Sequence, residues 1–144
     1  MSPAQESSPA DRRLVRVVAA LIFNGESVLV QQRPATKRHA LLWEFPGGKV
    51  EAGESEEEAL ARECREELGV EIRVECLEER VRHAYPDFDI DLALYRARIE
   101  RGEVRRLEAA KLCFVPVRQL AALPFTEADR PFVRRLAGQD ATRA

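Results

Sequence analysis

The chain has 144 residues, of which 45% are hydrophobic and 33% are charged, and its formal net charge is -2. This length and composition are typical of one folded domain and differ from those of a disordered chain. The nearly balanced charge argues against a broad grip on duplex nucleic acid, which needs a basic face, and no apolar run approaches the roughly 18 residues that span a membrane.

Both ends of the chain are predicted to be tails. Residues 1–12 are rich in Ser, Pro and Ala and lack the apolar core of a secretory signal, so we expect a flexible tail there, a single domain over 13–138 and a short flexible tail over 139–144. The widely spaced cysteines form no CxxC pair, which suggests reduced, partly buried thiols in a cytoplasmic protein.

Two apolar runs after the first tail predict a β-hairpin. VRVVAALIF (15–23) is followed by Asn24-Gly25 and then by ESVLVQQR (26–33), which alternates from Val28. Asn-Gly between such runs favours a type I′ turn with positive φ at both residues. Residues 34–46 contain two prolines and a basic cluster and are predicted to form a loop ending in WEFPGG.

A helix is predicted after Ser55, because Glu58 follows three residues later and completes a capping box, while Gly69 occupies the position of a C′ glycine. Three more strands are predicted in VEIRVECLEERV (70–81), DIDLALYRARI (89–99) and KLCFVPV (111–117). A last helix is predicted from about Thr126 to Leu136, with Pro131 complicating its start. The pattern predicts a mixed or largely antiparallel sheet with one central and one terminal helix.

The central helix is unusually acidic. A helix advances about 100° per residue, so Glu63, Glu66 and Glu67 share an arc of about 100° beside the buried stripe. Like charges at these spacings repel, and a divalent cation would convert them into oxygen ligands. A solvated charged face is the alternative. Glu56, Glu57 and Glu58 have a simpler explanation as exposed residues that complement the helix dipole.

The flanking residues favour the metal site. Gly47 and Gly48 precede the helix and permit close approach of the backbone to a ligand. In order, the segment consists of Gly48, five residues, Glu54, seven residues and then RECREELGV from Arg62. This resembles the Nudix hydrolase signature Gx5Ex7REUxEExGU, in which U is a bulky aliphatic residue. Its one departure is Cys64, where Ile, Leu or Val is usual.

The resemblance, which extends from about Val15 to Leu136 and is to MutT-like members, implies an α/β/α sandwich around a mixed sheet. It implies that Glu63, Glu66 and Glu67 bind Mg²⁺ or Mn²⁺ with the Gly47 carbonyl, and that Glu54 pairs with Arg62. Glu108 matches a further acid that MutT-like proteins use as a metal ligand or general base, although an ordinary loop acid is the alternative. The general base stays open among Glu108, Glu54 and a box glutamate.

Weaker matches to the family imply which residues contact the substrate. Arg33 matches a position that contacts phosphate, although a solvated arginine at a strand end is the alternative. Either Phe45 or Trp43 is expected to line a base pocket while the other packs in the core. Asp129 either reads the base or caps the last helix. If ionised it suits the amine of cytosine or adenine, and if protonated it suits an oxidised guanine, although Phe88 replaces a basic residue of some oxidised-guanine enzymes.

The predicted function is metal-dependent hydrolysis of modified or oxidised nucleoside triphosphates to a monophosphate and pyrophosphate, which sanitises the nucleotide pool. The alternatives are another Nudix substrate (a dinucleoside polyphosphate, a nucleotide sugar or an RNA 5′ end) or a non-catalytic domain that senses nucleotides. The expected partner is a small-molecule nucleotide, without duplex nucleic acid or membrane, and the protein is expected to be a monomer or homodimer.

Overall fold

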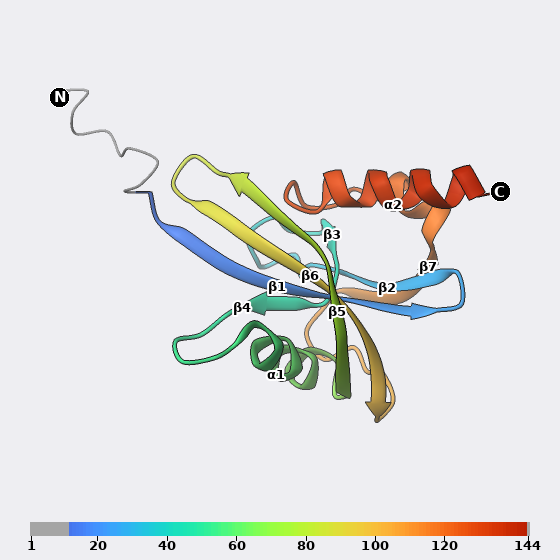
Figure 1. Cartoon of the computed structure of the whole chain (residues 1–144), viewed down its shortest axis with the longest axis horizontal. Helices are drawn as coiled ribbons and strands as arrows, with labels where there is room; N and C mark the ends of the chain where they lie inside the picture. Colours follow the sequence, from blue (N-terminus) through green and yellow to red (C-terminus); the bar gives the residue numbers. More distant parts are fainter. Residues whose placement is uncertain (1–11, 144) are drawn as a thin grey trace.

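The computed structural model describes residues 12–143 and places strands between two helices (Figure 1). In chain order the elements are β1 (Leu14–Asn24), β2 (Ser27–Gln32), β3 (Trp43–Glu44), β4 (Gly47–Lys49), α1 (Glu56–Leu68), β5 (Glu71–Ala84), β6 (Asp89–Arg101), β7 (Lys111–Pro116), the 3-10 helix η2 (Val117–Ala122) and α2 (Arg130–Arg143). Every strand and helix that the sequence predicts is present. The additional elements, β3, β4 and η2, are short.

The strands form one mixed sheet, as predicted. Its order is β3-β2-β1-β6-β5, with β4 also paired to β1 and β7 also paired to β2. Strands β1 and β6 are parallel, with partners from Leu14 and Asp89 to Ile22 and Ala97. The other pairings are antiparallel. Parallel neighbours need a crossover connection, and α1 lies within the one between β1 and β6.

Each face of the sheet is covered by one helix, which confirms the α/β/α sandwich (Figure 1). Successive side chains of a strand point to opposite faces. Accordingly Val18 and Ala20 of β1 pack with Leu60 and other residues of α1, whereas Leu21 packs with Phe132 and other residues of α2. Full burial of a side chain such as Leu60 contributes about 2 kcal/mol. The core therefore fixes α1 against the middle of the sheet.

The first hairpin has a different turn from the predicted one. Asn24 pairs with Ser27, so the two-residue loop is Gly25-Glu26 and not Asn24-Gly25. Gly25 has φ 62° and Glu26 is not among the residues with positive φ. Positive φ at the first central residue alone matches a type II′ turn, for which Gly is favoured at that position. The hairpin is confirmed and the type I′ turn is wrong, because Asn24 continues β1.

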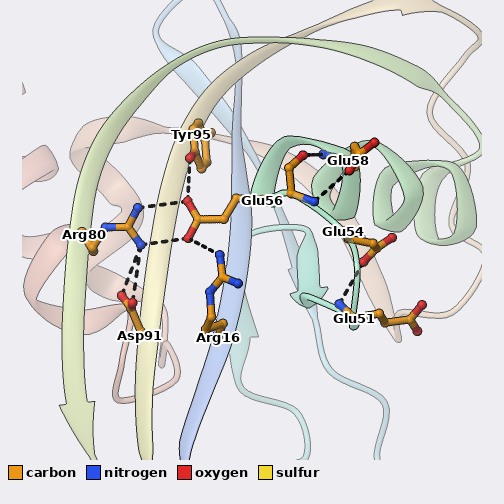
Figure 2. Close-up of polar contacts among 9 residues, drawn as sticks. Arg16, Glu51, Glu54, Glu56, Glu58, Arg80, Asp91 and Tyr95 are labelled. Carbon is orange, nitrogen blue, oxygen red and sulfur yellow. Dashed lines mark hydrogen bonds and ion pairs between the residues drawn. The ribbon is translucent and has the colours of Figure 1, made fainter.

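Glu56 is not the solvated first-turn acid that the sequence predicts. Its side chain is 10% exposed and accepts from Arg80 Nη1 (2.9 Å) and Nη2 (3.0 Å), from Tyr95 Oη (2.6 Å) and from Arg16 Nη2 (3.3 Å) (Figure 2). These partners lie on β5, β6 and β1, so one carboxylate ties the first turn of α1 to three strands. Asp91 contacts Arg80 from β6. The hydrogen bond from Arg80 is the largest of the effects that lower the pKa of Glu56 to about 2.

The ends of the domain differ in part from the prediction. Helix α2 starts at Arg130, with Pro131 in its first turn where a missing N–H is tolerated, and it continues to Arg143 instead of ending at Leu136. Residues 1–11 of the predicted first tail, and residue 144, lie outside the described part of the chain. Within the described part, no helix has the length and apolarity needed to cross a membrane.

The cysteines agree only in part with the predicted burial. Cys64, a residue of α1, is buried in the core between this helix and the sheet. Burial raises the pKa of its thiol to about 12, which leaves it protonated and unreactive. Cys76 and Cys113 are exposed, so the prediction of partial burial is wrong for them. They lie on β5 and β7, which form edges of the sheet.

Candidate active site

Helix α1 carries the predicted acids next to strand β4. The Ser55 hydroxyl accepts from the Glu58 N–H (3.0 Å) and Glu58 accepts from the Ser55 N–H (2.8 Å), which is the predicted capping box. Gly69 ends the helix in the left-handed region (φ 71°), as predicted for a C′ glycine. The caps fix where the helix begins and ends, and its buried stripe, which includes Leu60 and Leu68, fixes its rotation against the sheet.

Arg62 binds both the loop that precedes α1 and two acids that follow Arg62 within the helix. Its Nε and Nη2 donate to both oxygens of Glu54 (2.7 and 3.1 Å), which is the expected pair, and Nη2 also donates to the Lys49 carbonyl (3.0 Å). Its Nη1 donates to Glu63 Oε2 and Glu66 Oε1, both at 3.1 Å. A bidentate arginine–carboxylate pair is among the stronger polar contacts in proteins. The loop, β4 and the acidic turn are thereby held as one unit.

The glycine pair is required by close packing on two sides. Strand β4 pairs with β1 through Gly47–Ala19 and Gly48–Val18. A Cβ at Gly47 would overlap the Val18 carbonyl, and a Cβ at Gly48 would overlap the Glu63 carboxylate. We predicted close approach to a ligand at this point. The structure adds that the same glycines admit the backbone of β1 and the side chain of Glu63.

Glu67 lies deepest in the acidic cluster. Its Oε1 accepts from the Gly47 N–H (3.0 Å) and from Gln31 Nε2 (3.3 Å). Burial, together with the nearby charges of Glu63 and Glu44, raises the pKa of Glu67 to about 8. Burial likewise raises the pKa of Glu63 above its usual range. The cluster thus holds negative charge that the protein only partly compensates.

The loop between β6 and β7 brings Glu108 to the same cluster. The loop is fixed to the end of α1, because the Arg105 N–H donates to the Leu68 carbonyl (2.9 Å) and the Leu107 N–H donates to the Glu67 carbonyl (3.4 Å). Glu108 is exposed, lines the same cavity as Glu63, and its charge contributes to the raised pKa of Glu63. Glu103, its neighbour in the sequence, is not among the residues that line the cavity.

The donor set fits a hard divalent cation. Four carboxylates and the Gly47 carbonyl offer oxygen ligands, which Mg²⁺ and Mn²⁺ prefer. Among the described residues, no three acidic, histidine or cysteine side chains are already arranged around one ion position. Arg62 Nη1 instead contacts both Glu63 and Glu66. Arg62 holds one oxygen of each of these carboxylates, which leaves the other oxygen of each for a cation.

A cavity of about 730 Å³ extends from the acidic cluster to the loop before α2. Phe45 lines it and Trp43 does not, although both belong to the same buried core cluster. Phe45 is itself packed against the rings of Phe125 (5.5 Å between centroids) and Phe132 (6.1 Å). A volume of several hundred Å³ is typical of sites for small molecules.

Asp129 lines the far end of this cavity. Its carboxylate accepts from the Thr126 hydroxyl (2.8 Å), and burial raises its pKa to about 7. It directly precedes α2, and its backbone carbonyl starts the helix by accepting from the Val133 N–H (3.0 Å). Asp129 therefore lies directly before the helix and lines the cavity, while reading of the base by Asp129 stays a prediction.

Arg33 and Glu44 form a pair on the cavity wall. Arg33 Nη1 donates to Glu44 Oε1 (3.0 Å) and Arg33 Nε donates to the Arg38 carbonyl (2.7 Å). Arg33 is therefore held in place and is not the freely solvated strand-end residue of the alternative. Sequence reasoning missed Glu44, although its position between Trp43 and Phe45 in WEF was a usable signal. It also missed Gln31, for which the sequence carries no signal.

Comparison with known proteins now identifies the family. A family model described as NUDIX domain matches residues 18–135. The chain belongs to the Nudix family. A Mycobacterium tuberculosis protein, named provisionally as 8-oxo-dGTP diphosphatase 2, is 40% identical over 122 residues, which cover 84% of this chain and 86% of that protein. The CTP pyrophosphohydrolase of Escherichia coli is 53% identical over 62 residues, or 43% of this chain and 46% of that protein.

Solved structures support the same conclusion about the fold. The solution structure of the E. coli ORF135 protein matches this Nudix hydrolase with a TM-score of 0.79 at 32% identity, covering 95% of this chain and 98% of that one. Nudix hydrolases generally need a divalent metal, which agrees with the oxygen donors gathered around Glu63 and Glu67.

Proposed function

We propose that this Nudix hydrolase converts modified or oxidised nucleoside triphosphates to the monophosphate and pyrophosphate, and so sanitises the nucleotide pool. The observation that carries the proposal is a single cavity that is lined both by the acids of α1 and by Phe45 and Asp129. A triphosphate needs charge neutralisation at one end and recognition of the base at the other. This cavity offers both in one space.

The ligands proposed for Mg²⁺ or Mn²⁺ are the Gly47 carbonyl, Glu63, Glu66, Glu67 and Glu108. The metal supplies neutralisation of phosphate oxygens and activation of a water molecule. Among the residues of the chain, Glu54 holds Arg62, and Arg62 orders the loop next to the acids. We assign phosphate contact to Arg33, which lines the cavity beside the acidic cluster. The general base is proposed to be one of the box glutamates, Glu54 or Glu108.

The base is proposed to be an oxidised guanine or a cytosine. A pKa of about 7 places Asp129 in either protonation state near neutral pH. A protonated carboxyl donates to an oxidised guanine, and a carboxylate accepts from the amine of cytosine. These two chemistries match the activities for which the two relatives are named, 8-oxo-dGTP hydrolysis and CTP hydrolysis. We further propose a cytoplasmic monomer or homodimer.

A nucleotide panel tests the proposal. Turnover of 8-oxo-dGTP, dCTP, a modified dCTP and dGTP is measured with Mg²⁺, and the phosphate products are separated. We expect pyrophosphate as the phosphate product, and loss of turnover when the metal is chelated. Turnover restricted to dinucleoside polyphosphates, nucleotide sugars or capped RNA would refute the assignment of substrate. Nucleotide binding without turnover of any compound would show a sensing domain.

A further inference from the structure

One buried amide connects two carboxylates of the cavity wall. Gln31 is on β2, is 4% exposed and lines the cavity. Its Nε2 donates to Glu67 Oε1 (3.3 Å) and to Glu44 Oε2 (3.4 Å). An amide nitrogen has two hydrogens, so it can serve two acceptors at once. Side chains at this depth in a core are usually apolar, and a buried amide needs partners such as these.

The two carboxylates bound by Gln31 belong to different parts of the site. Glu67 is a proposed metal ligand, whereas Glu44 is paired with Arg33, the proposed phosphate contact. The resulting chain of contacts runs from Arg33 through Glu44 and Gln31 to Glu67, and ends at the Gly47 N–H (3.0 Å). Strand β2 therefore supplies the one side chain that touches both acids in the described structure.

The geometry at Glu67 is consistent with support of a metal ligand. Both described hydrogen bonds of its carboxylate, from Gly47 and from Gln31, end on Oε1. Oε2 accepts none of the described hydrogen bonds, and the described residues contain no buried polar side-chain atom without a partner, so Oε2 is open to the cavity. A carboxylate held by one oxygen and open at the other is oriented for a cation. Residues that orient metal ligands in this way commonly change metal affinity or activity by about 10- to 100-fold.

We propose that Gln31 is a positioning residue, which holds Glu67 for the metal and Glu44 for the substrate through a single amide. The part of this inference that concerns Glu44 and the substrate rests on the proposed function. The part that concerns Glu67 and the metal rests on the acidic cluster alone. Loss of the amide therefore loosens Glu67 and Glu44 together.

The experiment compares the full chain with Gln31→Met, which keeps a similar side-chain length and removes the donor. Mn²⁺ binding without nucleotide is measured by electron paramagnetic resonance, and kcat and KM are measured over a range of Mg²⁺ concentrations. We expect Mn²⁺ binding to weaken by about 10-fold or more. We also expect a rise in KM that added Mg²⁺ does not reverse, because Glu44 stays unsupported.

Gln32→Met is the matched control for metal binding. Gln32 follows in the same strand, but its amide donates to the Leu41 carbonyl (3.0 Å) in the loop, away from Glu67. Its Mn²⁺ affinity should equal that of the unmodified chain. Gln31→Leu, which also lacks a donor, provides the same test if Gln31→Met is poorly folded by circular dichroism.

The outcomes separate this inference from the proposed function. Unchanged Mn²⁺ affinity in a folded Gln31 variant would show that the amide only fills space, and would overturn the inference whatever the substrate. Equal weakening in Gln32→Met would overturn it as well. Weakened Mn²⁺ binding only at Gln31, in a chain that hydrolyses none of the nucleotides tested, would support the positioning role and refute the proposed function.

Discussion

Replacing Glu56 by Gln should destabilise the protein strongly at neutral pH. Gln has the same shape but lacks the negative charge that Arg80, Arg16 and the Tyr95 hydroxyl surround. The guanidinium of Arg80 would then face a neutral amide in place of the buried charge of Glu56. Glu56 lies on the first turn of α1, where an acid is normally of minor importance.

The magnitude follows from the pKa. The folded protein lowers the pKa of Glu56 from 4.5 to about 2, and each unit corresponds to about 1.4 kcal/mol, so the charge stabilises the fold by about 3 kcal/mol at pH 7. The stabilisation is present above the unfolded pKa and is lost as pH falls through the folded one. It should therefore drop to less than half by about pH 3.

Urea unfolding followed by circular dichroism measures this effect at both pH values. Glu57→Gln is the control, since Glu57 is the adjacent, exposed acid of the same turn, and its loss should change the free energy of unfolding by less than about 0.5 kcal/mol. If Glu56→Gln is as stable as Glu57→Gln at pH 7, or if the difference between the two does not shrink in acid, the reasoning is wrong.

Glu67→Gln should lower kcat by at least about 100-fold because a metal ligand is lost. Its unfolding temperature should be equal to or above that of the unmodified chain, since burial already raises the pKa of Glu67 to about 8. Gly48→Ala should reduce turnover about 10-fold or more with little change in stability, because the new Cβ displaces only the flexible carboxylate of Glu63. Gly138→Ala, a glycine-to-alanine change on the exposed side of α2, should leave turnover unchanged. Asp129→Asn should stabilise the protein above pH 7 by up to about 4 kcal/mol, because the folded protein raises the pKa of Asp129 from 3.8 to about 7 and so disfavours the charged form. The gain should shrink as pH falls from 7 towards 4, and a gain that is constant with pH would contradict the assignment.

The features that sequence alone predicted are those fixed by local pattern. The capping box at Ser55 and Glu58, the C′ glycine and the alternating strands depend on residues within a few positions of one another. The ion pair of Glu54 and Arg62 also lies within one short segment, and it is present in the structure. The family resemblance rests on the same segment, which explains why fold and family were predictable together.

The features that sequence did not predict depend on contacts between distant segments. Glu56 resembles any first-turn acid until Arg80 and Tyr95, 24 and 39 positions away, are placed beside it. Gln31 acquires its role only when β2 lies next to both Glu44 and the end of α1. The type of the first turn was missed for a smaller reason, since one additional residue of pairing in β1 moves the turn by one position.

The parallel pairing of β1 with β6 has a consequence for how the chain folds. Arg12 and Asp89, which meet at one end of this pairing, are 77 positions apart, whereas β5 and β6 are neighbours joined by a short turn. Closing a long loop before its contacts form slows folding. We expect the β5–β6 hairpin to form early and β1 to join it late, in the rate-limiting step. The glycine pair, whose position depends on β1, would then be among the last parts of the molecule to be completed.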